Sequence, residues 1–433
     1  MRWFGSSGVR GVAFDDFTLE LASQIGSAVG EKHKDVVIGR DARLTSPVFS
    51  YAVSSALMSV GADVCDIGIV TTPTLAYAAR DKSCGVMITA SHNPPEYNGI
   101  KLWNPDGSSF DTDQMEGTES RMIKGARPAD WKSVGSISLE PNATLDHKKR
   151  ILSLVGKSNI KVVVDCANGP ASLITPQLLE EMGCEVTTLN AQLDGSFSGR
   201  PGEPAEENLS ALKTAVVKHG ADLGIAHDGD ADRMVAIDDK GRYAGGDILL
   251  KVFAKELKAK SMVVPVDATM LLDDWFGKKI FRTRVGDAFI SEEVKKRNAD
   301  FGGEPSGTWV FPRISLCPDG ILAAAKLVEI CSERKLSSLV DAVPNLPMLK
   351  ETFKFESSKR EAILSNLKKD ISSMKALDVD TTDGFKLRFN DGWALVRLSG
   401  TEPKMRIVVE ARSIERAKEI MTSMKDIAKR CLS

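Results

Sequence analysis

Short apolar runs that alternate with helical stretches restrict the fold of this chain more than any other feature. Runs such as 35–39, 160–165 and 221–226 are rich in Val, Ile and Leu, whereas stretches such as 19–29 and 208–219 have helical periodicity. Strands that alternate with helices form βαβ units and mostly parallel sheets. The sequence therefore predicts an α/β protein.

The length of the chain predicts several domains. One domain usually takes about 100–200 residues, and the chain has 433 residues. We place α/β domains at 1–150, 151–246 and 247–350, followed by an α+β domain at 351–433. The last segment combines two helical stretches with strand-like runs, as expected for an antiparallel sheet covered by two helices.

Composition narrows the partners and the compartment. The formal net charge of −2 argues against nucleic acid or an anionic membrane as the main partner. Seven cysteines are scattered without a Cys-x-x-Cys pair, so neither a disulfide framework nor a zinc site is indicated. The N-terminus lacks the apolar core of a signal peptide, and no apolar run is long enough to span a membrane. We therefore expect a soluble, cytoplasmic protein.

Residues 85–101 carry the most specific chemistry. An apolar run typical of a buried strand opens into a polar turn at 90–95, where two prolines disfavour helix and central strand. Ser91 is thus expected just past the carboxyl end of a strand, where ligands bind in open α/β sheets. A serine nucleophile needs a base or a metal, and His92 and Lys101 are close in sequence. A capped turn with a packed histidine is the alternative.

An acidic turn provides a candidate metal site. Asp228, Asp230 and Asp232 alternate directly after an apolar run, so their three carboxylates can converge on one cation. Hard oxygen ligands suit Mg²⁺. A calcium-binding EF-hand loop would instead need glycine where Arg233 stands and glutamate where Asp239 stands. A solvated acidic turn is the other alternative.

Three further loops contain residue types that bind phosphate or sugar. The glycine-rich segment 4–11 contains Arg10, which can bind phosphate in a fork, although a flexible turn is the alternative there. Glu304 and Ser306 suit hydrogen bonds to neighbouring hydroxyls of a pyranose ring, although a plain turn is equally compatible. A third loop offers arginines, hydroxyls and free backbone amides that can cradle a dianionic phosphate. Its residues are Arg397, Ser399, Gly400, Thr401 and Arg406.

Taken together, these motifs resemble those of the α-D-phosphohexomutases. Thr-Ala-Ser-His-Asn-Pro followed by Asn-Gly-Ile-Lys is similar to the phosphoserine signature of that family, and Asp-Gly-Asp-Ala-Asp-Arg to its metal loop. Gly-Glu-Pro-Ser-Gly resembles its sugar-reading loop, and Arg-Leu-Ser-Gly-Thr-Glu-Pro its phosphate-binding loop. The resemblance implies three similar mixed α/β domains followed by a C-terminal α+β lid, all sharing a central active-site cleft.

The resemblance also implies a role for each candidate residue. The implied ligands of Mg²⁺ are Ser91, Asp228, Asp230 and Asp232. The implied catalytic residues are Ser91 as phosphoryl carrier, His92 and Lys101 as alternatives for the acid/base, and Arg10. The implied substrate contacts are Arg233, Gly286, Asp287, Glu304, Ser306, Arg397, Ser399, Gly400, Thr401 and Arg406.

The implied reaction interconverts hexose 6-phosphate and hexose 1-phosphate through a phosphoserine and a hexose 1,6-bisphosphate, which is also the activator. Asp287 and Thr308 stand where several branches have histidine, and this chain is more similar to archaeal-type members, often assigned to glucosamine 6-phosphate. We therefore predict conversion of glucosamine 6-phosphate to glucosamine 1-phosphate. Phosphomannomutase/phosphoglucomutase activity is the alternative, and a metal-dependent phosphatase and a non-catalytic phosphosugar sensor are more remote. The oligomeric state stays open between a monomer and a homodimer.

Overall fold

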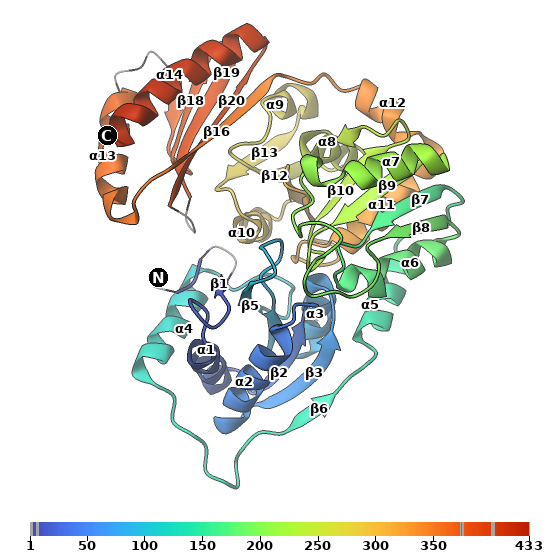
Figure 1. Cartoon of the computed structure of the whole chain (residues 1–433), viewed down its shortest axis with the longest axis vertical. Coiled ribbons are helices and arrows are strands. Elements are labelled where there is room, and N and C mark those ends of the chain that lie inside the picture. The colour runs from blue at the N-terminus through green and yellow to red at the C-terminus, as the bar shows by residue number, and fades with distance from the viewer. Residues whose placement is uncertain (1–2, 6–7, 373, 375, 400–402, 433) are drawn as a thin grey trace.

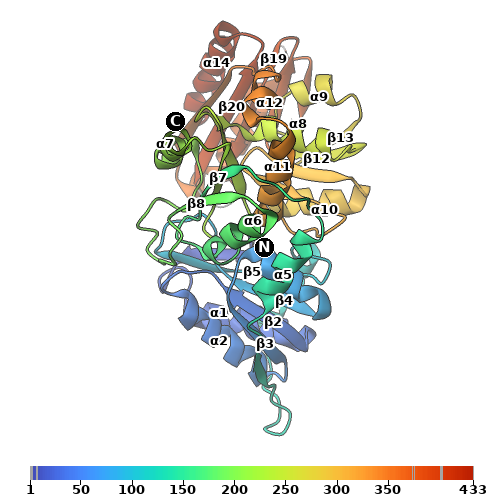
Figure 2. The same cartoon turned by 90° about the vertical axis from the view of Figure 1, so that its right-hand side faces the viewer.

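The described part of the chain forms four sheets, each with its own helices (Figure 1). This computed structural model describes residues 3–5, 8–372, 374, 376–399 and 403–432. We call each sheet with its helices a domain, numbered I to IV in chain order. Domain I and domain IV lie at opposite ends of the molecule, with domains II and III between them (Figure 2).

Domain I has a six-stranded sheet in the order β1-β5-β4-β2-β3-β6, in which β5 alone runs opposite to the other strands. Its strands are β1 (Val9–Val12), β2 (Asp35–Arg40), β3 (Asp63–Ile69), β4 (Cys84–Ile88), β5 (Tyr97–Trp103) and β6 (Ile137–Leu139). Its helices are α1 (Leu19–Lys32), α2 (Ser46–Ser59), α3 (Thr72–Ala78), η1 (Ala79–Asp81), α4 (Thr112–Lys124) and α5 (Ala143–Leu152).

Side-chain alternation along β2 decides which helices cover each face of this sheet. Val36 and Ile38 belong to the core that includes buried residues of α1, α2 and α4. Val37 lies in the opposite core with Leu75 of α3. The two faces of the sheet are therefore covered by different helices.

Domain II repeats the mixed arrangement with a five-stranded sheet in the order β11-β10-β9-β7-β8. Its strands are β7 (Lys161–Asp165), β8 (Glu185–Leu189), β9 (Leu223–His227), β10 (Met234–Asp238) and β11 (Tyr243–Ala244). Its helices are η2 (Pro170–Leu173), α6 (Thr175–Met182), η3 (Glu206–Asn208) and α7 (Ser210–His219). The stretch from 170 to 182 is not one helix: η2 ends at Leu173 and α6 begins at Thr175, with Pro176 in its first turn, where the missing N–H of a proline costs no helical hydrogen bond.

Domain III has a four-stranded sheet in the order β13-β12-β14-β15. Its strands are β12 (Ser261–Pro265), β13 (Lys279–Thr283), β14 (Phe301–Glu304) and β15 (Thr308–Val310). Its helices are α8 (Gly246–Glu256), α9 (Leu271–Phe276), α10 (Asp287–Arg297), α11 (Gly320–Glu333) and α12 (Leu336–Asp341). Buried residues of α8 and α11 belong to one core with residues of domain II, so domains II and III are packed as one body.

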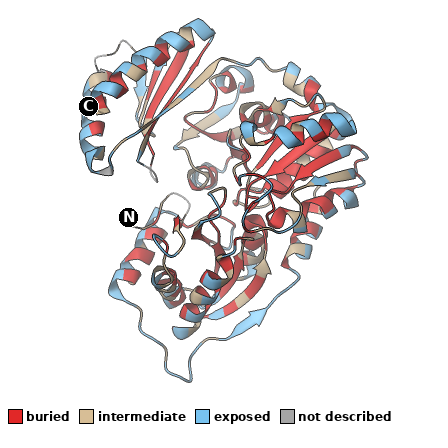
Figure 3. Ribbon diagram, in the orientation of Figure 1, coloured by how far each residue is buried: buried red, intermediate tan, exposed pale blue. Residues whose placement is uncertain are grey.

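Domain IV is the antiparallel α+β unit that the sequence predicts, with strands in the order β16-β20-β19-β18-β17. Its strands are β16 (Met348–Lys354), β17 (Asp378–Asp380), β18 (Phe385–Phe389), β19 (Gly392–Leu398) and β20 (Lys404–Ala411). Its helices are η4 (Ser357–Lys359), α13 (Arg360–Ser372) and α14 (Ile414–Leu432). The two longer helices cover one face of the sheet, and its central strands are mostly buried (Figure 3). The other face packs Trp393 and Leu395 against Val266 of domain III.

Some elements differ from the sequence-based expectation. No strand is predicted over 97–103, where the structure has β5. The predicted domain boundaries remain predictions, and the one at 350 falls within β16. No helix in the described residues has the length and apolar character needed to cross a membrane.

Candidate active site

A cleft of about 1900 Å³ lies where the four domains meet, and residues of each domain line it. Each domain contributes a predicted site residue to its lining: Ser91, Arg233, Glu304 and Arg397, in domain order. Three of the loops follow equivalent strands, because β4, β9 and β14 each end at the cleft and turn into an antiparallel neighbour. The predicted central cleft is therefore present.

Ser91 lies on the loop between β4 and β5 in a backbone conformation that a serine rarely adopts. Its φ of 52° lies in the left-handed region, and its N–H donates to Thr89 Oγ1 at 2.9 Å. The buried Ser91 hydroxyl donates to Asp228 Oδ2 of domain II at 2.9 Å. A Cβ at Gly229 would lie 2.4 Å from the Ser91 carbonyl oxygen, so only glycine allows the two loops to approach this closely.

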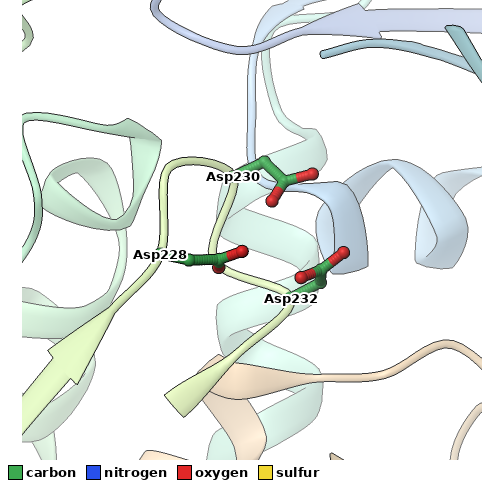
Figure 4. A group of neighbouring side chains, drawn as sticks. All are labelled: Asp228, Asp230 and Asp232. Atoms are coloured by element: carbon green, nitrogen blue, oxygen red, sulfur yellow. The ribbon is translucent and has the colours of Figure 1, made fainter. Parts of the chain in front are cut away.

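The three aspartates of the β9–β10 loop turn their carboxylates toward a common space (Figure 4). Their closest ligand oxygens lie within 4.8 Å of one another, and all three residues are buried. Asp230 Oδ2 accepts from Thr72 Oγ1 at 2.6 Å, but the buried Asp230 Oδ1 has no hydrogen-bond partner. Because an unpaired buried carboxylate oxygen is costly, this donor set fits a hard divalent cation.

Electrostatics at the triad support the same interpretation. Burial, together with Asp232 and Asp230, raises the pKa of Asp228 well above its usual value. Burial and Asp230 likewise raise the pKa of Asp232. Burial also opposes ionisation of Asp230, but Lys101 and the Thr72 hydroxyl outweigh it and lower that pKa. The mutual repulsion of the carboxylates is the kind that a bound cation relieves.

Lys101 reaches the metal loop from β5 in domain I. Its ammonium lies 2.9 Å from Asp230 Oδ2 and 2.5 Å from Asp232 Oδ2. Burial lowers the pKa of Lys101, but the two carboxylates more than compensate, and the net shift is upward. The structure thus brings the predicted lysine to the site as a cation.

His92 contacts both the serine and a residue that the sequence did not single out. Its Nδ1 lies 3.4 Å from Ser91 Oγ, and its Nε2 lies 3.2 Å from Glu203 Oε2. Since a carboxylate only accepts, we assign the proton of the neutral ring to Nε2, which turns the Nδ1 lone pair toward Ser91. Burial, followed by Arg233 and Arg10, lowers the pKa of His92 well below 6.5.

Two arginines line the cleft beside the serine. Arg10 donates to Asn93 Oδ1 at 3.2 Å. Arg233 donates to Glu203 Oε1 at 3.2 Å, and its Nε lies 3.9 Å from Asp228 Oδ2. Both guanidinium groups can therefore face a phosphate carried on the serine, as the sequence predicts.

The residues predicted to contact the sugar gather at the end of β14. Glu304 Oε1 accepts from the Gly286 N–H at 2.6 Å, and Glu304 Oε2 accepts from the Ser306 hydroxyl at 3.3 Å. Burial, with Asp287 next in importance, raises the pKa of Glu304 to about 7. Gly286 and Asp287, at the start of α10, also line the cleft. The structure brings all four predicted residues together.

Domain IV places cations at the far side of the cleft. Arg397 and Arg406 are direct partners across β19 and β20 and both line the cleft, as does Ser399. Arg360, at the start of α13, lies beside them and donates to the Ser399 carbonyl at 2.8 Å. No sequence motif marked Arg360, since its role depends on how α13 packs. Gly400 and Thr401, also predicted here, lie outside the described residues.

Comparisons with known proteins agree with this architecture. Family models described as "Phosphoglucomutase/phosphomannomutase, alpha/beta/alpha domain I", "domain II" and "domain III" match residues 1–128, 144–241 and 245–346. The corresponding "C-terminal domain" model matches residues 361–427.

Relatives match over the whole chain. It is 50% identical over 434 residues to a "Probable phosphoglucosamine mutase" of Methanocella arvoryzae, covering 100% of this chain and 99% of that protein. It is 40% identical over 449 residues to the "Phosphoglucosamine mutase" of Methanocaldococcus jannaschii, covering 100% and 99%. A crystal structure of a "Phosphoglucomutase/phosphomannomutase family protein" from Burkholderia thailandensis superposes with a TM-score of 0.88 at 27% identity, covering 98% of this chain and 97% of that one.

Four domains around one cleft, with cations at both ends and an acidic cluster beside a serine, define an enzyme that transfers phosphoryl groups within a small molecule. The chain belongs to the phosphoglucomutase/phosphomannomutase family, the α-D-phosphohexomutases, and is similar to its archaeal members. It is an isomerase that converts one phosphate ester of a hexose into another. The acidic triad gives it a site that fits a metal ion.

Proposed function

We propose that this phosphohexomutase interconverts glucosamine 6-phosphate and glucosamine 1-phosphate, with phosphomannomutase/phosphoglucomutase activity as the alternative. The names of its archaeal relatives support the amino sugar. The cleft adds support, because Glu304 and Asp287 place carboxylates between the two cationic ends, where a protonated 2-amino group is attracted.

The observation that carries the chemistry is the 2.9 Å hydrogen bond between the Ser91 hydroxyl and Asp228. It joins the predicted phosphoryl carrier to an acidic cluster that fits Mg²⁺. Asp228, Asp230, Asp232 and Ser91 would hold Mg²⁺, which would neutralise charge on the transferring phosphoryl oxygens. Arg10 and Arg233 add positive charge on the open side of the same group.

The proposed reaction consists of two phosphoryl transfers at Ser91. In the first, the P–O bond to Ser91 Oγ breaks, a new P–O bond forms to the free sugar hydroxyl, and its proton passes to a base. In the second, the other phosphoryl group of the 1,6-bisphosphate moves to Ser91 Oγ, and the proton returns to the departing sugar oxygen. His92, with its Nδ1 facing Ser91 Oγ, suits the base, whereas Lys101 is held as a cation by two carboxylates.

Between the two transfers the bisphosphate must turn end for end, so the sugar contacts have to work in two orientations. Glu304 and Ser306 suit the 3- and 4-hydroxyls, which exchange places when the sugar turns. The far phosphate would be held by Arg397, Arg406 and Ser399, with Gly400 and Thr401 on the same loop.

The proposal includes the conditions under which the enzyme works. Mg²⁺ is the proposed ion, and a hexose 1,6-bisphosphate the proposed activator and intermediate. The proposed partner is the phosphosugar alone, without nucleic acid, and a homodimer stands beside the monomer as an open alternative. Seven cysteines, all without a disulfide, suit the cytoplasm.

A comparison of three hexose phosphates tests the proposed substrate preference. We would compare kcat/KM for the 1-phosphates of glucosamine, glucose and mannose, with Mg²⁺ and a hexose 1,6-bisphosphate present. A preference for glucosamine of about tenfold or more, equivalent to about 1.4 kcal/mol, is expected. An equal or greater preference for glucose or mannose would transfer the proposal to the alternative. Release of free phosphate without isomerisation would indicate a phosphatase, and binding without turnover a sensor.

A further inference from the structure

Arg43 uses its whole guanidinium group to hold the serine loop. Its Nη2 donates to the carbonyls of Ser91 at 2.8 Å and Asn93 at 2.7 Å. Its Nη1 donates to the carbonyls of Pro94 at 2.5 Å and Tyr97 at 2.9 Å. The Nε–H completes the set with Asp41 Oδ2, so all five N–H donors are used.

This contact replaces the hydrogen bonds that the serine loop lacks. The loop leaves β4 in a left-handed turn at Ser91 and continues through two prolines, which have no N–H and cannot extend a strand. Two backbone turns, from the Asn93 N–H to the Ala90 carbonyl and from the Tyr97 N–H to the Pro94 carbonyl, hold the loop only in part. Four carbonyls of the loop and its junction with β5 converge on the Arg43 side chain. A planar fork of five donors suits this geometry, whereas an ammonium offers three.

The same network reaches the metal loop. Asp41 Oδ2 accepts from Arg43 Nε and also from the Thr89 hydroxyl at 2.7 Å. Thr89 Oγ1 in turn accepts from the Ser91 N–H and lies 3.3 Å from Asp230 Oδ2. A displacement of Arg43 therefore changes the position of the serine relative to the aspartates.

Arg43 also fixes the loop against domain II. Its guanidinium carbon lies 4.9 Å from the centroid of the Phe197 ring, and its side chain is almost completely buried. A Cβ at Gly195 would lie 2.4 Å from the Ala42 carbonyl oxygen, so the loop that contains Arg43 is in direct contact with the domain II loop that contains Phe197. The arginine is thus placed at the seam between the serine loop and the domain that supplies the acidic triad.

We propose that Arg43 is a positioning residue, which holds Ser91 at the distance from the acidic triad that phosphoryl transfer requires. It does not line the cleft, so it acts through the loop and not on the substrate. The inference rests on the proposed role of Ser91. It implies that Arg43 affects kcat far more than KM, because the sugar and far-phosphate contacts come from other domains.

The test is Arg43→Lys, which keeps the charge but loses the planar fork. With Mg²⁺, bisphosphate and the hexose phosphate that the wild type converts fastest, kcat should fall about 100-fold, the loss that a displacement of about 1 Å can cause. KM should change by less than about threefold. Arg40→Lys is the matched control, since Arg40 lies three residues earlier, near Asp66, and does not line the cleft.

A normal kcat per folded molecule in R43K, with Ser91 phosphorylated to the wild-type level by mass spectrometry, would overturn the inference. Should R43K fail to fold, Phe197→Leu provides the second measurement, because it removes the ring beneath the guanidinium and leaves the five donors in place. We expect kcat of Phe197→Leu to fall by at least about threefold, and an unchanged kcat there would equally overturn the inference. Failure of the proposed function is distinguished by Ser91→Ala, which would then remain active.

Discussion

At the scale of single residues, the strongest constraint is that Ser91 is held in a left-handed conformation against Asp228. Such backbone strain costs about 1–3 kcal/mol and persists only where the surroundings enforce it. Here the surroundings include Arg43 and the bare backbone of Gly229. The hydroxyl is therefore placed before any substrate binds.

Ser91→Ala should lower the mutase activity by a factor of at least about 1000, because no phosphoryl carrier remains. The measurement is isomerisation of the preferred hexose phosphate with bisphosphate present, together with phosphate incorporation into the protein. Ser83→Ala is the control and should retain normal activity, because Ser83 precedes β4, at the opposite end of that strand from Ser91, and does not line the cleft. Substantial activity of Ser91→Ala would disprove the phosphoserine role.

Asp230→Asn should weaken the metal site, because the substitution removes the negative charge and one of the two carboxylate oxygens. One of these oxygens, the buried Oδ1, has no hydrogen-bond partner. We expect activity to fall by about 100-fold or more, and the Mg²⁺ concentration for half-maximal activity to rise. Direct titration with Mn²⁺ gives a readout that does not depend on turnover. The control is Asp426→Asn, an exposed aspartate on α14 of domain IV. An unchanged metal requirement would contradict the assignment.

How well a residue could be predicted depends on whether its role is local in the sequence. Ser91 and the three aspartates stand in short motifs directly after strands, so their chemistry is visible before folding. Glu203 meets His92 only because domain II packs on domain I, and no pattern in the sequence marks that contact. The four carbonyls held by Arg43 are likewise invisible, since backbone groups leave no trace in residue types.

At the scale of elements, polar groups buried between domains III and IV determine the orientation of the C-terminal sheet against domain III. Glu410 on β20 accepts from the Thr269 hydroxyl at 2.5 Å and from the Met270 N–H at 2.8 Å. Lys386 on β18 donates to the Val266 carbonyl at 2.5 Å. These contacts give the sheet a defined orientation against β12, where apolar packing alone would allow sliding.

Lys386 makes this contact sensitive to pH. Burial, followed by Arg282, lowers its pKa from 10.5 to about 7. Other charged groups that affect it are Asp267, Asp273 and Glu410. Between about pH 7 and 10.5 the unfolded chain binds a proton that the folded chain does not, so this group makes stability rise with pH in that window. Below pH 7 both states are protonated and its contribution is constant.

Lys386→Met should therefore lose that part of the pH dependence. Thermal unfolding of domain IV, followed from pH 7 to 10, should show the wild type gaining stability relative to K386M as the pH rises. Lys418→Met, an exposed lysine on α14, should run parallel to the wild type. Parallel curves for K386M and the wild type would disprove the inferred shift.

Periodicity predicted the elements better when they were regular and amphipathic. The helices α1 and α7 and the strands β2 and β7 lie close to their expected bounds. In contrast, β5 contains Asn98, Gly99 and Lys101, and these residues indicate a loop until the serine loop folds over them. Neighbouring strands, and not local propensity, decide the conformation of such a segment.

At the scale of the whole molecule, the sequence predicts which loops face the cleft but not how far apart they lie. Those distances depend on packing between domains, such as the shared core of domains II and III. The cleft of about 1900 Å³ is lined by residues of all four domains, and domain IV supplies Arg397 and Arg406 to it. We predict that a closing motion of domain IV narrows this cleft, as the lid role expected from the sequence requires.

Arg397→Ala tests whether domain IV acts in substrate binding and not in phosphoryl transfer. The guanidinium lies on β19 near Asp383, whose carboxylate accepts from the Val285 N–H at 3.1 Å, so domains III and IV position it jointly. Loss of a charge-assisted phosphate contact that is equally strong in ground state and transition state raises KM and leaves kcat nearly unchanged.

We expect a KM about 30-fold higher, within the range of a hydrogen bond to a charged group, with Mg²⁺ dependence as in the wild type. Arg388→Ala, an exposed arginine of the same sheet paired with Asp378, is the matched control and should keep a normal KM. A normal KM for R397A would remove Arg397 from the phosphate site. A fall in kcat alone would instead place its effect at the transferring phosphoryl group, and domain IV would then act on the chemistry and not on substrate capture.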